Sequence, residues 1–300
     1  MTTAANKPFT ITPVYDLLLR GSTDMPVGLY HLHQATAEQL TRLHYKAGML
    51  KTVSKRLKVL ADNGYVQADC IPTKRFKSPY YYTLDNRGMR YLESIGLDTD
   101  ISFRASKEVS ESYLHLRHAL ELNDVYIAAL QLKPVTNNRY YLARYIQERT
   151  FKRAPLTFTY NGANIRLIPD GSLDIRQRRQ SQPDSRLFMI LEHDRGTEQQ
   201  EHFRRRIRTY SAFVGSGAYK QLLGVERITV AFTTFVGSRR IAQMREWTLA
   251  ELQATHEPAA IGQTFLFANF SKPLDPRQVW LEPAWYTPYE TVPPISLLGA

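Results

Sequence analysis

The sequence is poor in cysteine and has no long apolar run. Its 300 residues contain a single cysteine, Cys70, which excludes a disulfide framework and a zinc ribbon built from cysteines. No stretch approaches the ~20 apolar residues that a membrane span needs. The first 16 residues also lack the apolar core of a secretion signal. We therefore expect a cytoplasmic protein that has no membrane partner.

Acidic residues are scarce relative to basic ones. The chain has 28 Asp and Glu against 39 Lys and Arg, which gives a formal net charge of +11. This excess indicates a polyanionic partner, and nucleic acid is the leading candidate. The alternative is a basic protein without such a partner. Hydrophobic residues make up 43% of the chain, enough to build cores, and the length suggests about two domains.

Changes of pattern along the chain predict an α/β protein (α+β overall) in four segments. The predicted segments are a winged helix-turn-helix DNA-binding domain over residues 1–100, a connecting helix and linker over 101–137, a mixed-sheet α/β domain over 138–270, and a proline- and aromatic-rich extension over 271–300.

The first segment has the order of elements of a winged helix-turn-helix. Predicted helices cover residues 12–22, 35–45, 50–64 and 86–96, and predicted strands cover 65–69 and 79–85. Thr36 is the expected N-cap of the second helix, and Gly48 supplies the turn before the third. A helix that follows a tight turn is the element that enters the major groove of DNA in this class. Double-stranded DNA is therefore the expected partner.

The third predicted helix has one apolar and one basic face. Val53, Leu57 and Leu60 are spaced to form a buried stripe, and Lys51, Lys55 and Lys58 fall about 200° away. The alternative is a protein-binding module with a solvated lysine face. The predicted DNA contacts are Lys51, Thr52, Lys55, Arg56 and Lys58 on the helix, and Lys74, Arg75 and Lys77 at the tip of the following hairpin.

The rest of the chain predicts a mixed sheet with a crossover helix. A long helix over 106–132, capped by Ser106 or Ser110, precedes it. Asn161 and Gly162 form a hairpin turn. Thr197 is a possible helix N-cap. Predicted helices cover 138–151, 197–216 and 240–254, and predicted strands include 165–175, 187–194, 227–235 and 263–270.

Three acidic residues in the second half of the chain lie at the ends of predicted apolar strands. Asp170 follows Pro169, and Glu192 and Asp194 close the stretch "LFMILEHD" on one strand face. They either form a metal site or are structural acids held by arginines. The candidate arginines are Arg195, Arg206 and Arg208.

Several motifs in the chain resemble the replication-relaxation family. The stretches "IPDG", "LEHDRGTE", "RIRTY" and "LRHALELNDV" carry the resemblance, which covers most of residues 11–235. The order of elements also resembles a PD-(D/E)xK nuclease-like core, as in restriction endonucleases. The resemblance implies association with DNA replication or relaxation, on plasmids, phages and other mobile elements.

The nuclease-like resemblance implies a catalytic and metal-binding role for particular residues. Asp170 and Glu192 would be catalytic acids that bind Mg²⁺ or Mn²⁺, with Glu148 as an outer metal ligand. Asp194 stands where the resembled core has a lysine, which puts activity in doubt. Arg206 is the candidate substitute cation, although arginine is a poor general base.

Three functions remain open at this point. The first is a DNA-binding accessory protein, which could also recruit a protein partner or form a homodimer. The others are a metal-dependent endonuclease or nickase, and a transcriptional regulator with a dimerisation domain. Two arginine runs could also hold a second DNA segment or be solvated charge: Arg176, Arg178 and Arg179, and Arg204, Arg205, Arg206 and Arg208.

Overall fold

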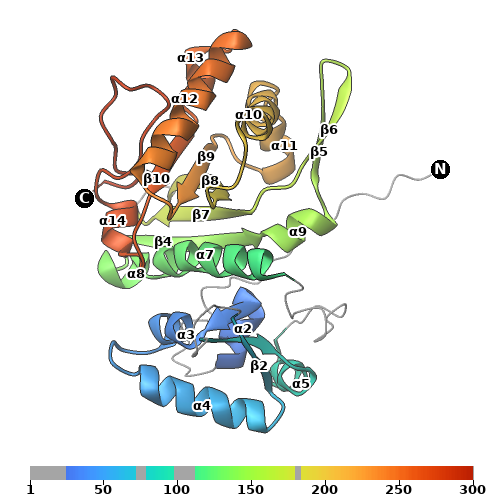
Figure 1. Ribbon diagram of the computed structural model, residues 1–300, viewed down its shortest axis with the longest axis vertical. Coiled ribbons are helices and arrows are strands. Elements are labelled where there is room, and N and C mark those ends of the chain that lie inside the picture. Colours follow the sequence, from blue (N-terminus) through green and yellow to red (C-terminus); the bar gives the residue numbers. More distant parts are fainter. Residues whose placement is uncertain (1–24, 72–78, 98–111, 180–183, 300) are drawn as a thin grey trace, which may run out of the picture. The chain divides into compact units, whose positions relative to one another are not determined.

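The computed structural model describes residues 25–71, 79–97, 112–179 and 184–299. The chain divides into two compact units, Met1–Val109 and Ser110–Ala300 (Figure 1). Several predicted features lie outside the described residues. These are the helix over 12–22, the hairpin-tip cations Lys74, Arg75 and Lys77, and the caps Ser106 and Ser110.

The first unit combines helices with a small antiparallel sheet in the order β1-β3-β2. Its elements are α2 (Met25–Leu32), β1 (Gln34–Thr36), α3 (Ala37–His44), α4 (Leu50–Asp62), β2 (Val66–Cys70), β3 (Tyr80–Leu84) and α5 (Asn86–Ser94). The helices predicted over 35–45, 50–64 and 86–96 and both predicted strands are confirmed. Helix α2 was not predicted. Its Gly28 lies directly against the His44 side chain, so a larger residue there would separate α2 from α3.

The predicted start of α3 is confirmed by a capping box. The Thr36 hydroxyl accepts a hydrogen bond from the Gln39 backbone N–H at 3.2 Å. The Gln39 side chain accepts one from the Thr36 backbone N–H at 3.1 Å. Gly48 has a φ of +88° in the turn that follows α3, a conformation that glycine adopts without strain. These local signals fix where α3 begins and where α4 can start.

The second unit is built on a mixed five-stranded sheet, as predicted. The strand order is β10-β9-β8-β7-β4. The strands are β4 (Tyr140–Gln147), β7 (Gly171–Gln177), β8 (Ser185–Asp194), β9 (Thr229–Thr234) and β10 (Phe265–Asn269). Strands β4, β7 and β8 pair antiparallel, whereas β8, β9 and β10 pair parallel. The apolar strand β8 lies at the centre of the sheet, which is why its residues from Phe188 onward are buried.

Helices cover both faces of this sheet. Helix α7 (Tyr113–Leu130) lies on one face, and α10 (Gln200–Gly215) and α12 (Ser238–Ala254) lie on the other (Figure 1). A hairpin turns at Asn161 and Gly162, as predicted, and both residues have positive φ. The remaining elements are α8 (Leu132–Val135), α9 (Glu148–Arg153), β5 (Leu156–Tyr160), β6 (Ala163–Leu167), α11 (Ala218–Leu223), α13 (Ala259–Gly262) and α14 (Pro276–Trp280).

The helix predicted over 138–151 is wrong for most of its length. Residues 140–147 form strand β4, and the helix α9 begins only at Glu148. Tyrosines favour strands, and β4 gains backbone pairing with β7 along its length, with one irregularity between Leu142 and Arg144. The strand predicted over 165–175 is likewise two strands, β6 and β7. Pro169, which has no backbone N–H, lies in the break between them.

Several predicted boundaries also differ from the structure. Ser112 caps α7, and Gln199 rather than Thr197 is the N-cap residue of α10. Of the connecting helix and linker predicted over 101–137, the structure describes residues 112–137, and α7 there packs on the sheet of the second unit. In the extension, Asp275 caps a short helix that was not expected. Trp280 and Trp285 are fully buried there and anchor the extension by packing.

Candidate nucleic-acid interface and buried acidic cluster

Helix α4 presents the two faces that its sequence predicts. Val53 and Leu57 are fully buried and Leu60 is half-buried, while Lys51, Lys55 and Lys58 are exposed. The apolar side chains attach α4 to the rest of the unit, since it contacts α3 and β2. The lysines therefore form a basic face that is open to solvent.

The cations of α4 differ in what holds them. Lys58 pairs with Asp62 one turn later at 2.9 Å, in an exposed ion pair. Arg56 donates to the Tyr45 hydroxyl at 3.1 Å, and its guanidinium lies 5.6 Å from the centre of that ring. Among the described residues, Lys51 and Lys55 form no ion pair. These two lysines are accordingly the best placed of the predicted helix contacts, and Thr52 between them is half-buried.

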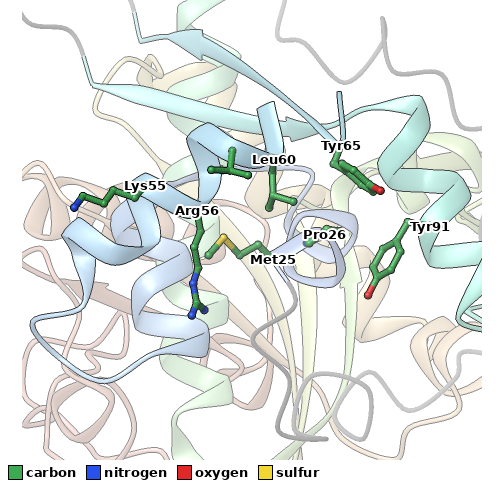
Figure 2. A pocket seen from close by; sticks show the side chains of 8 residues that line it. Met25, Pro26, Lys55, Arg56, Leu60, Tyr65 and Tyr91 are labelled. Atoms are coloured by element: carbon green, nitrogen blue, oxygen red, sulfur yellow. The ribbon is translucent and has the colours of Figure 1, made fainter. Parts of the chain in front are cut away.

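A hollow of about 540 Å³ adjoins this helix. Figure 2 shows Lys55, Arg56 and Leu60 of α4 on one side of it, with the end of Lys55 pointing away, and Tyr65 and Tyr91 on the other side. Most of the lining is apolar, with Met25, Pro26 and Val59 completing it. The two cations therefore lie at the border between the basic face and an apolar recess.

Glu192 is buried in the second unit and is held by two side chains of α10. Arg206 donates to Glu192 Oε2 at 2.8 Å, and the Tyr210 hydroxyl donates to Oε1. Burial, with the negative charge of Asp170, raises the pKa of Glu192 to about 8, although Arg206 acts to lower it. Arg206 also donates to Glu198 at 2.9 Å. Arg206, the cation predicted to lie near these acids, therefore binds the Glu192 carboxylate directly.

Asp170 lies at the start of β7, beside the end of β8. The antiparallel register pairs Gly171 with Leu191, which brings Asp170 next to the acids of β8. Its Oδ2 accepts from the His193 backbone N–H at 2.7 Å, and its Oδ1 lies 3.2 Å from His118 Nε2. Burial acts to raise the pKa of Asp170, but His118, the His193 backbone N–H and the charge of Arg206 together outweigh burial and lower the pKa.

Asp194 is neutralised by an arginine of a different helix. Arg240 of α12 forms a bidentate pair with it, with both N–O distances at 2.7 Å. The Gly196 backbone N–H donates to the same carboxylate at 2.7 Å. Such a planar two-bond pair is the strongest arrangement for a buried carboxylate. Where the resembled nuclease core has a lysine, this chain therefore has a closed ion pair.

The side chain between these acids faces the opposite way, toward α7. His193 Nε2 bonds to Glu121 Oε2 at 3.1 Å, and its Nδ1 bonds to Thr233 at 2.9 Å. Although burial acts to raise the pKa of Glu121, His193 and the charge of Lys272 lower it to about 2. Lys272 lies 3.3 Å from Glu121. A second buried ionic network thus joins α7 to the sheet.

The predicted metal ligands do not fit a metal ion as placed. Both oxygens of Asp170, of Glu192 and of Asp194 already accept hydrogen bonds from protein groups. Glu148 pairs with Lys152 at 2.7 Å. Within the described ranges, no group of three or more His, Cys, Asp or Glu could hold a metal ion. The acids therefore act as acceptors for arginine, histidine, tyrosine and backbone N–H groups.

The sequence predicted some of the partners of the three acids and not others. It placed Arg206 near Glu192, and Glu192 and Asp194 on one strand face, and both placements are confirmed by the contacts. It took Arg195 and Arg208 as alternative partners, but Arg195 donates to the Leu114 carbonyl and Arg208 pairs with Glu201. Arg240 was missed, because it lies 46 residues from Asp194 and no local pattern connects them.

The described residues contain no helix long and apolar enough to span a membrane. The two units together define a protein with a small helical unit that presents a basic helix, and an α/β unit with arginine-neutralised acids at its centre. The chain belongs to the replication-relaxation family, whose model matches residues 28–229. No curated protein and no solved structure matches the chain.

Proposed function

We propose that the protein binds double-stranded DNA through α4 and acts in the replication or relaxation of a plasmid, phage or other mobile element. Membership of the replication-relaxation family supports the process. The exposed basic face of α4, opposite its buried stripe, is the single observation that supports the binding surface.

The neighbourhood of α4 supports a winged helix-turn-helix mode of binding. The order α3, turn, α4, β2, β3 leaves α4 attached through one face and free to enter a groove with the other. Lys51 and Lys55 would contact phosphates, and phosphate contacts supply affinity more than sequence choice. Arg56 would need to leave Tyr45 to reach a base edge.

The second unit supports a binding protein rather than a metal-dependent endonuclease. Each of the three central acids is neutralised or hydrogen-bonded within the unit. A carboxylate that already has its partners contributes to the packing of the fold, and a cation from solution would have to compete with those partners. This arrangement agrees with a core that is related to nucleases but does not cleave DNA.

Replacing Lys51 and Lys55 by alanine tests the proposed surface. We expect weaker binding of a short duplex, and a slope of log K against log salt concentration that is smaller by roughly 0.9 for each phosphate that the variant no longer neutralises. Fluorescence anisotropy across a salt series measures both quantities. Arg90→Ala, which removes an exposed cation from α5, is the matched control. An unchanged affinity and slope in the lysine variant would refute this placement of the DNA.

A further inference from the structure

We infer that the second unit carries its own surface for the phosphates of duplex DNA, at the sheet edge where β4 begins and β7 ends. This inference deepens the proposed function and rests on it. We call the site the strand-end basic surface, and its residues are Lys133, Arg139, Arg178, Arg179 and Arg277. They come from α8, from the residues flanking β4 and β7, and from α14.

The pairing of β4 with β7 brings two of these arginines together. Tyr140 pairs with Gln177, so the residues just outside the ladder, Arg139 and Arg178, are also neighbours. The Arg178 backbone N–H donates to the Arg139 carbonyl at 2.9 Å, which fixes this neighbourhood. The fold therefore places two arginines side by side at this edge of the sheet.

Tyrosine rings hold both arginines in place. The Arg178 guanidinium lies 5.2 Å from the centre of the Tyr141 ring, and that of Arg139 lies 5.3 Å from the Tyr140 ring. A guanidinium that rests on an aromatic face keeps its N–H groups directed outward, so less rotamer freedom is lost on binding. Both arginines are exposed. The rings thus hold the two guanidinium groups in defined positions.

Two short helices add positive charge to the same edge. The pKa of Lys133 on α8 is lowered by burial and by the positive charge of Arg178, which shows that the two cations are close. The Arg277 guanidinium of α14 donates to the Val135 carbonyl of α8 at 3.2 Å. Helices α8 and α14 lie beside one another in Figure 1. These contacts link α14 to α8 and α8 to the end of β7.

Two acids lie near these arginines: Asp184 accepts hydrogen bonds from neutral groups, whereas Asp174 is neutralised by arginines. The Tyr141 hydroxyl donates to Asp184 Oδ2 at 2.7 Å, and the Arg179 backbone N–H donates to Oδ1 at 3.4 Å. Asp174 is buried beneath Arg186 and Arg176, at 2.9 and 3.3 Å. Arg176, although part of the same arginine run, is thus neutralised and does not belong to the surface.

The second arginine run of the chain serves as an internal comparison. On α10, Arg204 pairs with Glu251, Arg206 with Glu192, and Arg208 with Glu201 and Glu251. Those arginines brace α10 against α12 and the sheet. The run at the end of β7 makes no comparable set of ion pairs within the described ranges. Of the two runs that could hold DNA, the structure therefore favours the one that ends β7.

Duplex DNA is the anion that these observations favour. Cations from four segments along one edge match a row of phosphates better than a single small anion. The family to which the chain belongs takes its name from a DNA process. Phosphate contacts are also the kind that arginine forms with most geometric specificity.

The test compares full-length variants on one labelled duplex of about 30 base pairs, which is long compared with the ~10 Å over which salt screens charges and so gives each phosphate surface room to bind. Arg178→Ala/Arg179→Ala removes two charges from the strand-end basic surface. Arg166→Ala/Arg239→Ala removes two exposed arginines of the same unit and is the matched control. We expect the first variant to lower the salt slope by roughly 0.9 to 1.8 and the control to change it little.

Three outcomes would overturn the inference. One is an Arg178/Arg179 variant that binds duplex with the affinity and slope of the control while circular dichroism shows it folded. Another is wild-type binding of poly-L-glutamate that is lost in this variant while duplex binding is kept, which would assign the surface to an acidic protein. A loss on a single-stranded 30-mer but none on the duplex would overturn the duplex assignment in the same way.

The Lys51→Ala/Lys55→Ala variant separates the inference from the proposed function. If only the lysine variant loses affinity, DNA binding by α4 stands and the strand-end basic surface fails. If only the Arg178/Arg179 variant loses affinity, the second unit binds DNA and the placement on α4 fails. If the wild-type protein binds neither probe, both fail together.

Discussion

The role of Glu192 in the structure differs from the role that its sequence context suggests. In the sequence it is an acid at the end of an apolar strand, as a metal ligand would be. In the fold it is buried, and Arg206 and Tyr210 bind its two oxygens. A buried carboxylate is stable only with such partners. Glu192 therefore contributes to the packing of α10 on the sheet.

Removing the partner cation of Glu192 should destabilise the fold most when the acid is ionised. At pH 9, above its raised pKa, we expect Arg206→Met to lower the free energy of unfolding by about 3 kcal/mol. At pH 6 the loss should be smaller, because the acid can take up a proton. Urea unfolding at both pH values measures this. Arg205→Met, an exposed neighbour, should change stability by less than about 0.5 kcal/mol. Equal losses in the two variants would contradict the assignment.

The raised pKa of Glu192 also predicts a pH dependence of stability. Between its ordinary value of 4.5 and about 8, the folded protein keeps a proton that the unfolded chain has lost. The stability that Glu192 contributes is therefore full below pH 4.5 and is lost as the pH rises toward 8. Glu192→Gln carries no such proton, so its stability relative to wild type should improve from pH 5 to pH 8.5. A constant difference between the two proteins would refute the raised pKa.

At the scale of elements, local signals and long-range contacts differ in what they reveal. Residues close together in the sequence determine three features: the N-cap Thr36, the turn at Gly48 and the two faces of α4. These features were predicted correctly. Strand β4 was mistaken for a helix, because its ladder with β7 depends on residues about thirty positions later. Arg240 was missed for the same reason.

The capping box of α3 gives a prediction at this scale. Thr36→Ala removes the acceptor for the Gln39 N–H, and we expect a loss of about 1 kcal/mol in the free energy of unfolding. Thr36→Ser keeps a hydroxyl at the same position and should retain most of that stability. Thermal and urea unfolding of both variants measure the difference. Equal losses would show that the methyl group, and not the cap, stabilises this helix.

For the whole molecule, the sequence predicted a two-part chain with a mixed sheet, and the structure shows both. The sequence could not predict which groups bind the central acids. Whether Asp170, Glu192 and Asp194 meet a metal ion or an arginine depends on which helices cover the sheet. That information lies in the packing of α10 and α12 on one face and α7 on the other.

Addition of divalent metal tests this interpretation of the whole core. Because the carboxylate oxygens accept hydrogen bonds within the protein, we expect millimolar Mg²⁺ or Mn²⁺ to leave Tm unchanged and to support no nicking of a supercoiled plasmid. A contrary result would be metal-dependent nicking that both Asp170→Ala and Glu192→Ala abolish. That outcome would restore the endonuclease hypothesis.

The central claim is that α4 lies on DNA, and cleavage from a tethered iron chelate tests it most directly. Cys70 is exposed and is first replaced by serine, after which an iron–EDTA group is attached at Lys55→Cys. The same group at Arg90→Cys on α5 gives the background. We predict strand cleavage of a bound duplex from position 55 well above that from position 90. A stable complex with no cleavage above background from position 55 would contradict the account.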